Sequence, residues 1–256
     1  MLRLIISFLT LITVLSCNKF DKVMIIGHRG AMGHIAENTI PSINKAMELG
    51  VDGIEIDVFK CKSGELVVFH DERLERLTNS SGFIESLELD SIKNIIVLDK
   101  YRIPTLEEVL QLIDGQVKLN IELKGYGTAS PTNYLINQYN NKGGWTEDKF
   151  IISSFKWDEL EKIRELNMTI PIAVLVNSNV NPIDALPFAK KIKAIAINPY
   201  FKDLNQKNIE KIQSNGLKVF PYTINELDDI ERMIKLGADA IITDYPERVN
   251  KLKGLF

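Results

Sequence analysis

The sequence GIEIDV at residues 53–58 alternates apolar and acidic side chains, with Glu55 and Asp57 two positions apart. Successive side chains of a β-strand point to opposite faces, so both carboxylates lie on one face and the isoleucines on the other. The sequence KLNIELK at residues 118–124 repeats this pattern with Glu122 and Lys124. We therefore expect two strands of one sheet that carry charged groups on the same face.

Six further β-rich runs continue this rhythm. They occupy residues 23–27, 150–154, 170–176, 194–198, 217–223 and 240–244. Segments of helical period lie between them, such as residues 41–49, 105–113 and 226–236, and Thr105 with Glu108 predicts a capping box. Eight strands alternating with helices in 256 residues predict a (β/α)8 TIM barrel, which takes about 250 residues. An open doubly wound sheet is the alternative, but no G-x-G-x-x-G turn follows the first strand.

One segment departs from the alternation of strands and helices. The turn residues Ser63 and Gly64 lead into another β-rich run at residues 66–69, which predicts a hairpin with the strand before it. Residues 71–101 are polar and mixed, so we expect an elaborated loop on the catalytic side of the barrel. No linker or low-complexity tract appears elsewhere, and residues 23–256 are therefore predicted to form one domain.

The composition is that of an ordinary globular protein. Hydrophobic residues make up 45% of the chain and charged residues 25%, which excludes a disordered or collagen-like chain. The net charge of -3 gives no electrostatic footprint for nucleic acid, so we expect no nucleic-acid partner.

The N-terminus has the features of an export signal. Arg3 precedes a mostly apolar run at residues 4–16, which is shorter than the roughly 20 residues that a membrane span needs. The sequence VLSC at residues 14–17 resembles the lipobox of bacterial lipoproteins. We expect a signal peptide at residues 1–16, lipidation of Cys17, a tether at residues 17–22 and anchoring to a bacterial membrane in the cell envelope, on its periplasmic or surface side. An ordinary signal peptide followed by a chance cysteine is the alternative.

Carboxylates and imidazoles gather where the predicted strands end. Glu55, Asp57 and Glu122 are expected to converge at the barrel mouth, where three carboxylates form a site for a hard divalent cation such as Mg²⁺, Ca²⁺ or Mn²⁺. His28 and His70 also follow β-rich runs. Imidazoles beside a metal suit general acid and base catalysis, because they titrate near neutral pH.

Two other residues are expected to take no part in this chemistry. His34 lies in the loop at residues 31–36 and should face solvent. Cys61 has no neighbours of metal-ligand spacing, so it should be a free thiol.

An ordered set of motifs resembles the glycerophosphodiester phosphodiesterase family, over residues 23 to about 249. The motifs are GHRGA at residues 27–31, ENT at 37–39, ExD at 55–57, HD at 70–71, IPTLEE at 103–108, ExK at 122–124, SF at 154–155 and IITDYP at 241–246. The resemblance implies a TIM barrel that hydrolyses glycerophosphodiesters to an alcohol and glycerol 3-phosphate with one divalent metal.

The resemblance also implies roles for individual residues. The metal ligands would be Glu55, Asp57 and Glu122, and the acid and base would be His28 and His70. Arg29 and Lys124 would face the phosphate. With a divalent cation, the carboxylates, Arg29 and Lys124 would carry a net charge of about +1, which favours a phosphodiester monoanion. The sequence does not decide which histidine is the acid, nor whether water or the substrate's own hydroxyl attacks.

The chain departs from the family pattern at three positions. Ala36 replaces a frequent proline, Cys61 replaces a polar residue, and Tyr222 stands where tryptophan is frequent. Tyr222 is expected on the substrate-facing wall and weakens any inference about the alcohol. The alternatives are a phospholipase D-like or phosphoinositide-type enzyme acting on lipids, and a non-catalytic ligand-binding envelope lipoprotein.

Overall fold

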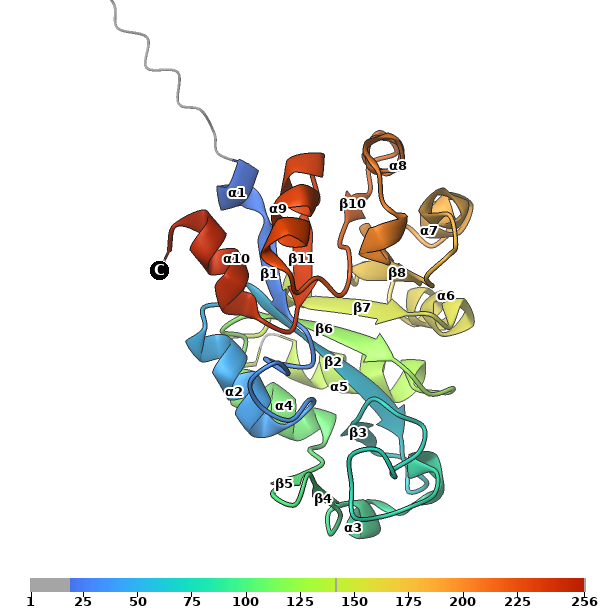
Figure 1. Cartoon of the computed structure of the whole chain (residues 1–256). Helices are drawn as coiled ribbons and strands as arrows, with labels where there is room; N and C mark the ends of the chain where they lie inside the picture. The colour runs from blue at the N-terminus through green and yellow to red at the C-terminus, as the bar shows by residue number, and fades with distance from the viewer. Residues whose placement is uncertain (1–18, 141, 256) are drawn as a thin grey trace, which may run out of the picture.

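The computed structural model describes residues 19–140 and 142–255 (Figure 1). Eight parallel strands form the barrel in the order β10-β9-β8-β7-β6-β2-β1-β11. Their bounds are Met24–Gly27 (β1), Gly53–Lys60 (β2), Lys118–Leu123 (β6), Phe150–Ser154 (β7), Ile172–Val176 (β8), Ala196–Pro199 (β9), Lys218–Val219 (β10) and Ala240–Thr243 (β11). The predicted (β/α)8 barrel is confirmed.

The barrel closes between the segment that begins with β10 and strand β11. The Asp239 N–H donates to the Val219 carbonyl at 2.9 Å, and the Ile242 N–H donates to the Pro221 carbonyl at 3.2 Å. The regular strand there, Lys218–Val219, is shorter than our expected strand at residues 217–223, although the Phe220 and Tyr222 N–H groups still donate to the Ile197 and Pro199 carbonyls at 3.1 Å. Pro221 has no N–H to donate, and proline interrupts a ladder for this reason.

Helices surround the barrel, one after each strand or its inserted loop (Figure 1). They are α2 (Ile40–Glu48), α4 (Leu106–Ile113), α5 (Ala129–Tyr139), α6 (Trp157–Leu166), α7 (Leu186–Lys191), α8 (Gln206–Gln213), α9 (Leu227–Leu236) and α10 (Pro246–Lys253). The capping box of α4 is confirmed, since the Glu108 N–H donates to Thr105 Oγ1 at 3.1 Å and the Thr105 N–H donates to Glu108 Oε2 at 2.8 Å. A short helix, α1 (Lys19–Lys22), lies before β1, and short 3₁₀ turns occupy Ile84–Ser86, Glu147–Lys149, Pro182–Ala185 and Phe201–Asp203.

The interior of the barrel is filled rather than open. Its apolar plug comprises Ile26, Ile151, Ala173, Ala196, Phe220, Ala240 and Ile242. A larger apolar layer lies between the strands and the surrounding helices. The polar interior positions of β2 and β6 therefore lie beside this plug, towards the carboxyl ends of the strands, where barrel enzymes place their chemistry.

The predicted hairpin is also confirmed, with β3 (Leu66–Val68) antiparallel to β2. The loop that follows contains α3 (Leu89–Ile92) and a small sheet of β4 (Ile96–Val97) and β5 (Tyr101–Arg102). We expected this segment to be polar and mixed, but it buries an apolar core of its own against the barrel. That core comprises Phe59, Cys61, Val67, Phe69, Leu74, Ile84, Ile92, Ile95, Val97 and Ile103.

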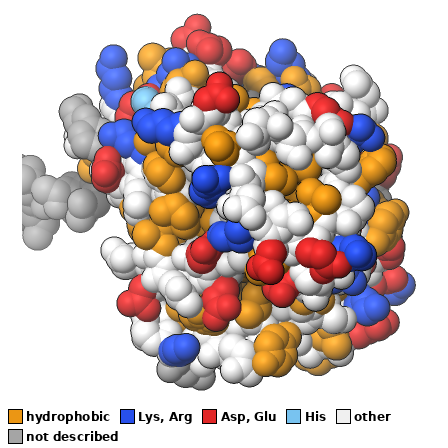
Figure 2. Space-filling view, turned by 90° about the horizontal axis from the view of Figure 1, so that it is seen from below, with side chains coloured by type: hydrophobic (Ala, Val, Ile, Leu, Met, Phe, Trp, Pro, Cys, Tyr) orange, Lys and Arg blue, Asp and Glu red, His pale blue; other side chains and the backbone are white. Residues whose placement is uncertain are grey.

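The surface carries charges of both signs. On the face drawn in Figure 2, lysine and arginine side chains are scattered among aspartate and glutamate rather than gathered in one basic patch. Within residues 19–140 and 142–255, no helix has the length and apolar character needed to cross a bilayer. The predicted signal peptide and Cys17 lie outside the described residues.

Candidate active site

The turn after β1 places His28 and Arg29 at the barrel mouth. A Cβ atom on Gly27 would lie 2.4 Å from the Gly30 carbonyl oxygen, and one on Gly30 would lie 2.6 Å from the backbone of Ser42. Gly30 also has φ of 87° and Arg29 has φ of 51°. A side chain at Gly27 or at Gly30 would collide with neighbouring backbone, so the motif GHRG needs both glycines to present the two side chains between them.

Three carboxylates meet beside this turn. Glu55 and Asp57 point inward from β2, and in the parallel register of β2 with β6 Glu55 lies opposite Asn120 and Asp57 opposite Glu122. One oxygen from each of Glu55, Asp57 and Glu122 lies within 4.8 Å of the others, and all three residues are buried. The structure brings the three predicted ligands together, in an arrangement that could hold a metal ion.

The electrostatics of this cluster favour an additional cation. Burial, together with Asp57 and Glu122, raises the pKa of Glu55 well above its usual value. Burial and the neighbouring Asp57 raise the pKa of Glu122 to about 7. Glu55 Oε1 is also buried with no hydrogen-bond partner among the described residues. An oxygen left unpaired in a carboxylate cluster fits a divalent cation, since buried charges are otherwise costly.

Two cations face the same carboxylates. Lys124 Nζ lies 3.0 Å from Glu122 Oε1 and 3.9 Å from Asp57 Oδ1. Burial alone would lower the pKa of Lys124, but Glu122 and Asp57 outweigh it and raise that pKa, so Lys124 is charged. Arg29 Nε lies 3.3 Å from Asp57 Oδ2, and the Arg29 backbone N–H donates to Glu55 Oε2 at 3.0 Å. Both predicted phosphate-facing cations therefore lie at the mouth beside the carboxylates.

Each predicted acid–base histidine has a carboxylate behind it. His28 Nδ1 lies 2.7 Å from Asp244 Oδ1, and His70 Nδ1 lies 2.6 Å from Asp71 Oδ1. Burial would raise the pKa of each aspartate, but hydrogen bonds outweigh it: those from Arg76 and His70 lower the pKa of Asp71 to about 2, and the one from His28 lowers that of Asp244.

These aspartates assign the histidine tautomers. Ionised carboxylates only accept hydrogen bonds, so Nδ1 carries the proton in both imidazoles and Nε2 is left to exchange one. The Nε2 atoms face the cluster: that of His28 lies 3.9 Å from Glu55 Oε2, and that of His70 lies 3.2 Å from Lys124 Nζ. Burial lowers the pKa of His70, and Arg29 and Lys124 act in the same direction.

Several supporting residues had no role in the sequence analysis. Asn38 Nδ2 donates to Asp57 Oδ2 at 2.8 Å, and Glu37 Oε1 accepts from Arg29 Nη1 at 2.7 Å. Arg76 contacts both Glu37 and Asp71. The motifs quoted above contain four of these supporting residues: Glu37, Asn38, Asp71 and Asp244. Their place in the motifs was the only sequence signal for a role in the site, and Arg76 had no such signal.

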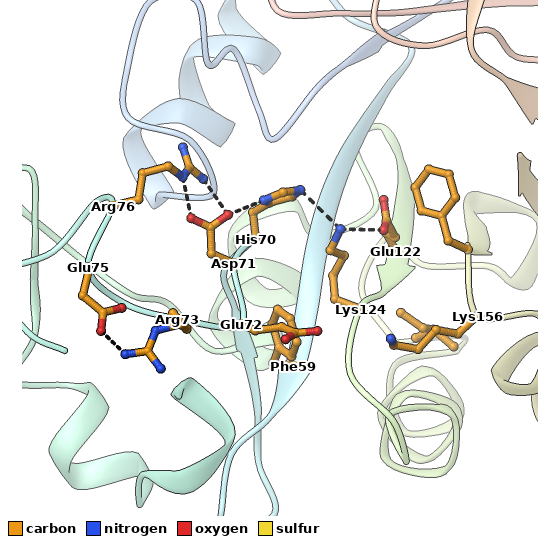
Figure 3. A pocket seen from close by; sticks show the side chains of 12 residues that line it. Phe59, His70, Asp71, Glu72, Arg73, Glu75, Arg76, Glu122, Lys124 and Lys156 are labelled. Atoms are coloured by element: carbon orange, nitrogen blue, oxygen red, sulfur yellow. Dashed lines mark hydrogen bonds and ion pairs between the residues drawn. The ribbon is translucent and has the colours of Figure 1, made fainter. Parts of the chain in front are cut away.

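Two adjoining cavities open at the mouth. The inner cavity, of about 170 Å³, is lined by His28, Glu55 and Tyr222 among others. The outer one, of about 790 Å³, is lined by the side chains shown in Figure 3, which include Glu72 and Lys156. His70, Glu122, Lys124 and Phe155 line both cavities. The Tyr222 hydroxyl donates to the Val176 carbonyl at 2.7 Å, so its ring is held as a wall of the inner cavity, next to Phe155.

The two residues expected to lie outside this chemistry do so. His34 is exposed and lies 2.9 Å from Glu247. Cys61 is a buried free thiol whose Sγ lies 3.2 Å from Glu65 Oε2.

Comparison with known proteins identifies the family. The model of the glycerophosphoryl diester phosphodiesterase family matches residues 28–248. The chain is 36% identical over 244 residues to the glycerophosphodiester phosphodiesterase of Caldanaerobacter subterraneus subsp. tengcongensis, covering 90% of this chain and 98% of that protein. It is 31% identical over 259 residues to a Bacillus subtilis enzyme of the same name, and the match covers 91% of this chain and 87% of that protein.

Solved structures agree with this match. The structure of an Oleispira antarctica phosphodiesterase in complex with the product sn-glycerol-3-phosphate is 25% identical, with a TM-score of 0.82, and the match covers 92% of this chain and 99% of that one. The family model spans most of this chain, and the barrel brings together the three carboxylates of the ExD and ExK motifs. The chain therefore belongs to the glycerophosphoryl diester phosphodiesterase family.

Proposed function

We propose that this glycerophosphodiester phosphodiesterase hydrolyses its substrates to an alcohol and glycerol 3-phosphate with one divalent cation held by Glu55, Asp57 and Glu122. Mg²⁺ or Ca²⁺ is the expected ion, with Mn²⁺ as a third candidate, since all three prefer oxygen ligands. The observation that carries this proposal is the cluster of three buried carboxylates within 4.8 Å, two of them with raised pKa values.

A cation bound there would polarise a phosphoryl oxygen and help to activate the attacking hydroxyl. Arg29 and Lys124 bind the phosphate oxygens, because both are charged and both face the mouth. Their fixed positions beside the carboxylates stabilise the charge that develops on the phosphoryl group in the transition state.

The two histidines move the protons. One imidazole accepts a proton at Nε2 from the attacking hydroxyl, and the other donates a proton from Nε2 to the leaving alcohol. Asp244 and Asp71 hold the imidazoles in the required tautomer and orientation. The lowered pKa of His70 keeps it neutral near pH 7, which suits the accepting role.

The cavities suggest how the substrate is divided. The inner cavity is smaller than the sites that hold drug-sized ligands, whereas the outer cavity lies within that range. The glycerol 3-phosphate part, with Tyr222 on one wall, is assigned to the inner cavity and the alcohol to the outer one. A phosphodiesterase of the same fold, from Oleispira antarctica, binds the product sn-glycerol-3-phosphate, which supports a glycerol 3-phosphate site in this barrel.

An assay of wild-type enzyme on a substrate panel tests the function. Glycerophosphocholine, glycerophosphoethanolamine and lysophosphatidylcholine would be incubated with protein freed of metal and with protein resupplied with Mg²⁺, Ca²⁺ or Mn²⁺. We expect glycerol 3-phosphate from the first two substrates with metal only. Full turnover by verified metal-free protein would refute the metal site, and faster turnover of lysophosphatidylcholine would favour a lipid-directed enzyme.

We further propose that residues 1–16 are a signal peptide and that Cys17 carries lipid, which would anchor the enzyme in a bacterial cell envelope. The basic Arg3, the apolar run and the lipobox-like residues 14–17 support this proposal. In Figure 1, α1 lies at the start of β1, whereas the site follows its end, so the anchor would leave the mouth facing away from the membrane. Expression of wild type and Cys17→Ser, followed by membrane fractionation, tests the anchor; equal membrane association would refute it.

A further inference from the structure

A continuous series of polar and charged side chains crosses the barrel mouth. Figure 3 shows its first part, in which Glu122, Lys124, His70, Asp71 and Arg76 lie in a row from β6 to the loop after β3. Successive polar atoms along this row lie 3.0, 3.2, 2.6 and 2.9 Å apart. The series connects a proposed metal ligand to a proposed acid–base histidine and then to Arg76.

The second part runs from Arg76 to the other side of the mouth. Arg76 Nη1 donates to Glu37 Oε2 at 3.0 Å, and Nη2 donates to Glu37 Oε1 at 2.8 Å. Glu37 Oε1 also accepts from Arg29 Nη1, and Arg29 Nε lies 3.3 Å from Asp57 Oδ2. The series therefore ends at a second proposed metal ligand, and Arg76 joins its two halves.

Arg76 has the geometry needed for this junction. Its guanidinium contacts both oxygens of Glu37 and both oxygens of Asp71. Arginine suits such a position because its planar fork can serve two carboxylates at fixed angles. Among residues 19–140 and 142–255, no other side chain is hydrogen-bonded to both Glu37 and Asp71.

The neighbouring backbone fixes where Arg76 can reach. Leu74 is fully buried in the core of the inserted loop, and its N–H donates to the Gly82 carbonyl at 3.0 Å. Ala36, in the loop after β1, packs against the same apolar cluster as Leu74. The Arg76 side chain is 46% exposed, whereas Glu37 is only 5% exposed, so the carboxylate is the buried partner of the pair.

We propose that Arg76 is a positioning residue that orients His70 and Arg29 together. It holds Asp71 in place to accept from His70 Nδ1, and it occupies both oxygens of Glu37. Without Arg76, the buried Glu37 would have Arg29 as its remaining hydrogen-bonded cation and would draw that guanidinium away from the phosphate. Asp71 would lose its restraint, and the imidazole it orients would lose its fixed direction. This inference rests on the proposed roles of His70 and Arg29.

The test compares three substitutions in the full-length enzyme with saturating metal. Arg76→Gln should lower kcat/KM roughly 10- to 100-fold, the range seen when residues that orient a catalytic ligand are removed. Arg76→Lys should lower it by at least about fivefold, because a single ammonium cannot serve both carboxylates. Arg102→Gln is the matched control: Arg102 donates to the Asn94 and Ile95 carbonyls within the same inserted loop, and its loss should change kcat/KM less than about twofold.

Two measurements separate positioning from a general structural role. If Arg76 acts through Asp71, the double variant Arg76→Gln with Asp71→Asn should lose much less than the product of the two single losses. Guanidinium ion added in solution should restore part of the activity of Arg76→Ala and leave Arg102→Ala unchanged. Melting temperatures of all variants would be recorded in parallel.

Several results would overturn the proposal. These are wild-type kcat/KM in Arg76→Lys or Arg76→Gln, losses that multiply in the double variant, or an equal loss in Arg102→Gln. If Arg76→Gln does not fold, Arg76→Lys decides the question by its activity at an unchanged melting temperature. Wild-type enzyme inactive on every glycerophosphodiester with metal would instead refute the proposed function.

Discussion

Replacing Glu122 by glutamine should stabilise the metal-free protein above neutral pH while it abolishes hydrolysis. The pKa of Glu122 rises from 4.5 to about 7, chiefly because the carboxyl is buried and Asp57 lies beside it. At about 1.4 kcal/mol per pKa unit, ionising this carboxyl in the folded state costs about 3 kcal/mol relative to the unfolded chain.

The sign of the effect follows from linkage. A carboxyl whose pKa is raised by folding favours the folded state below the unfolded pKa of 4.5, and this advantage is lost as the pH rises through about 7. An uncharged amide cannot ionise and keeps the advantage at every pH. At pH 8 the free energy of unfolding of metal-free Glu122→Gln should therefore exceed that of wild type by up to about 3 kcal/mol, or about 6–12 °C in Tm. At pH 5 the difference should be only about 1 kcal/mol.

Urea unfolding in the presence of a chelator, at pH 5 and pH 8, measures this difference. Glu159→Gln is the matched control, because both of its carboxylate oxygens accept backbone N–H groups at the start of α5, from Gly127 and Ala129. That substitution should destabilise the protein, since an amide has one acceptor oxygen rather than two. If metal-free Glu122→Gln is less stable than wild type at pH 8, or gains equally at both pH values, the reasoning about the carboxylate cluster is wrong.

Three other outcomes follow from the geometry of the histidines. His28→Ala and His70→Ala should each lower kcat by roughly 10²–10⁴, the usual scale of acid–base catalysis, and a change under threefold in steady-state assays would remove that residue from the role. Asp244→Asn should also lower kcat with little change in Tm, because an amide can donate to Nδ1 of His28 and favour the wrong tautomer; unchanged kcat would show that this hydrogen bond does not set the tautomer. Because burial and Lys124 lower the pKa of His70, activity that needs its neutral form should be lost only as the pH falls below 6.5, and an acidic limb of kcat/KM above pH 7 would contradict this.

The local pattern of the sequence was enough to predict the fold class. Alternating apolar and polar side chains in residues 53–58 and 118–124 predicted which faces of β2 and β6 point inward. The Thr105 capping box predicted where α4 begins. These features depend on residues a few positions apart, whose geometry is set by backbone sterics and hydrogen bonding. The strand expected at residues 217–223 proved shorter. Pro221 lacks an N–H, and the effect of that loss depends on which strand lies beside it, which only the fold decides.

The candidate site could be predicted only in part. Glu55 and Asp57 share a face by alternation alone, but Glu122 joins them because β6 pairs beside β2 in a register that sets it opposite Asp57. A shift of one residue would turn Glu122 to the other face, and that register is fixed by packing along the whole strand. The apolar core of the inserted loop between β2 and α4 was not predicted either, because its members are scattered over residues 59–103 and only the fold brings them together.

The sequence by itself was enough to predict the barrel, the three carboxylates, the two histidines and the cations Arg29 and Lys124, because strand alternation and ordered motifs are local properties of the chain. The tertiary structure alone decided their partners. Asp244 reaches His28 across 216 residues because the barrel closes β11 against β1, and Arg76 reaches Glu37 because the inserted loop folds onto the turn after β1. Such pairings depend on closure and packing of the whole barrel, which no short stretch of sequence encodes.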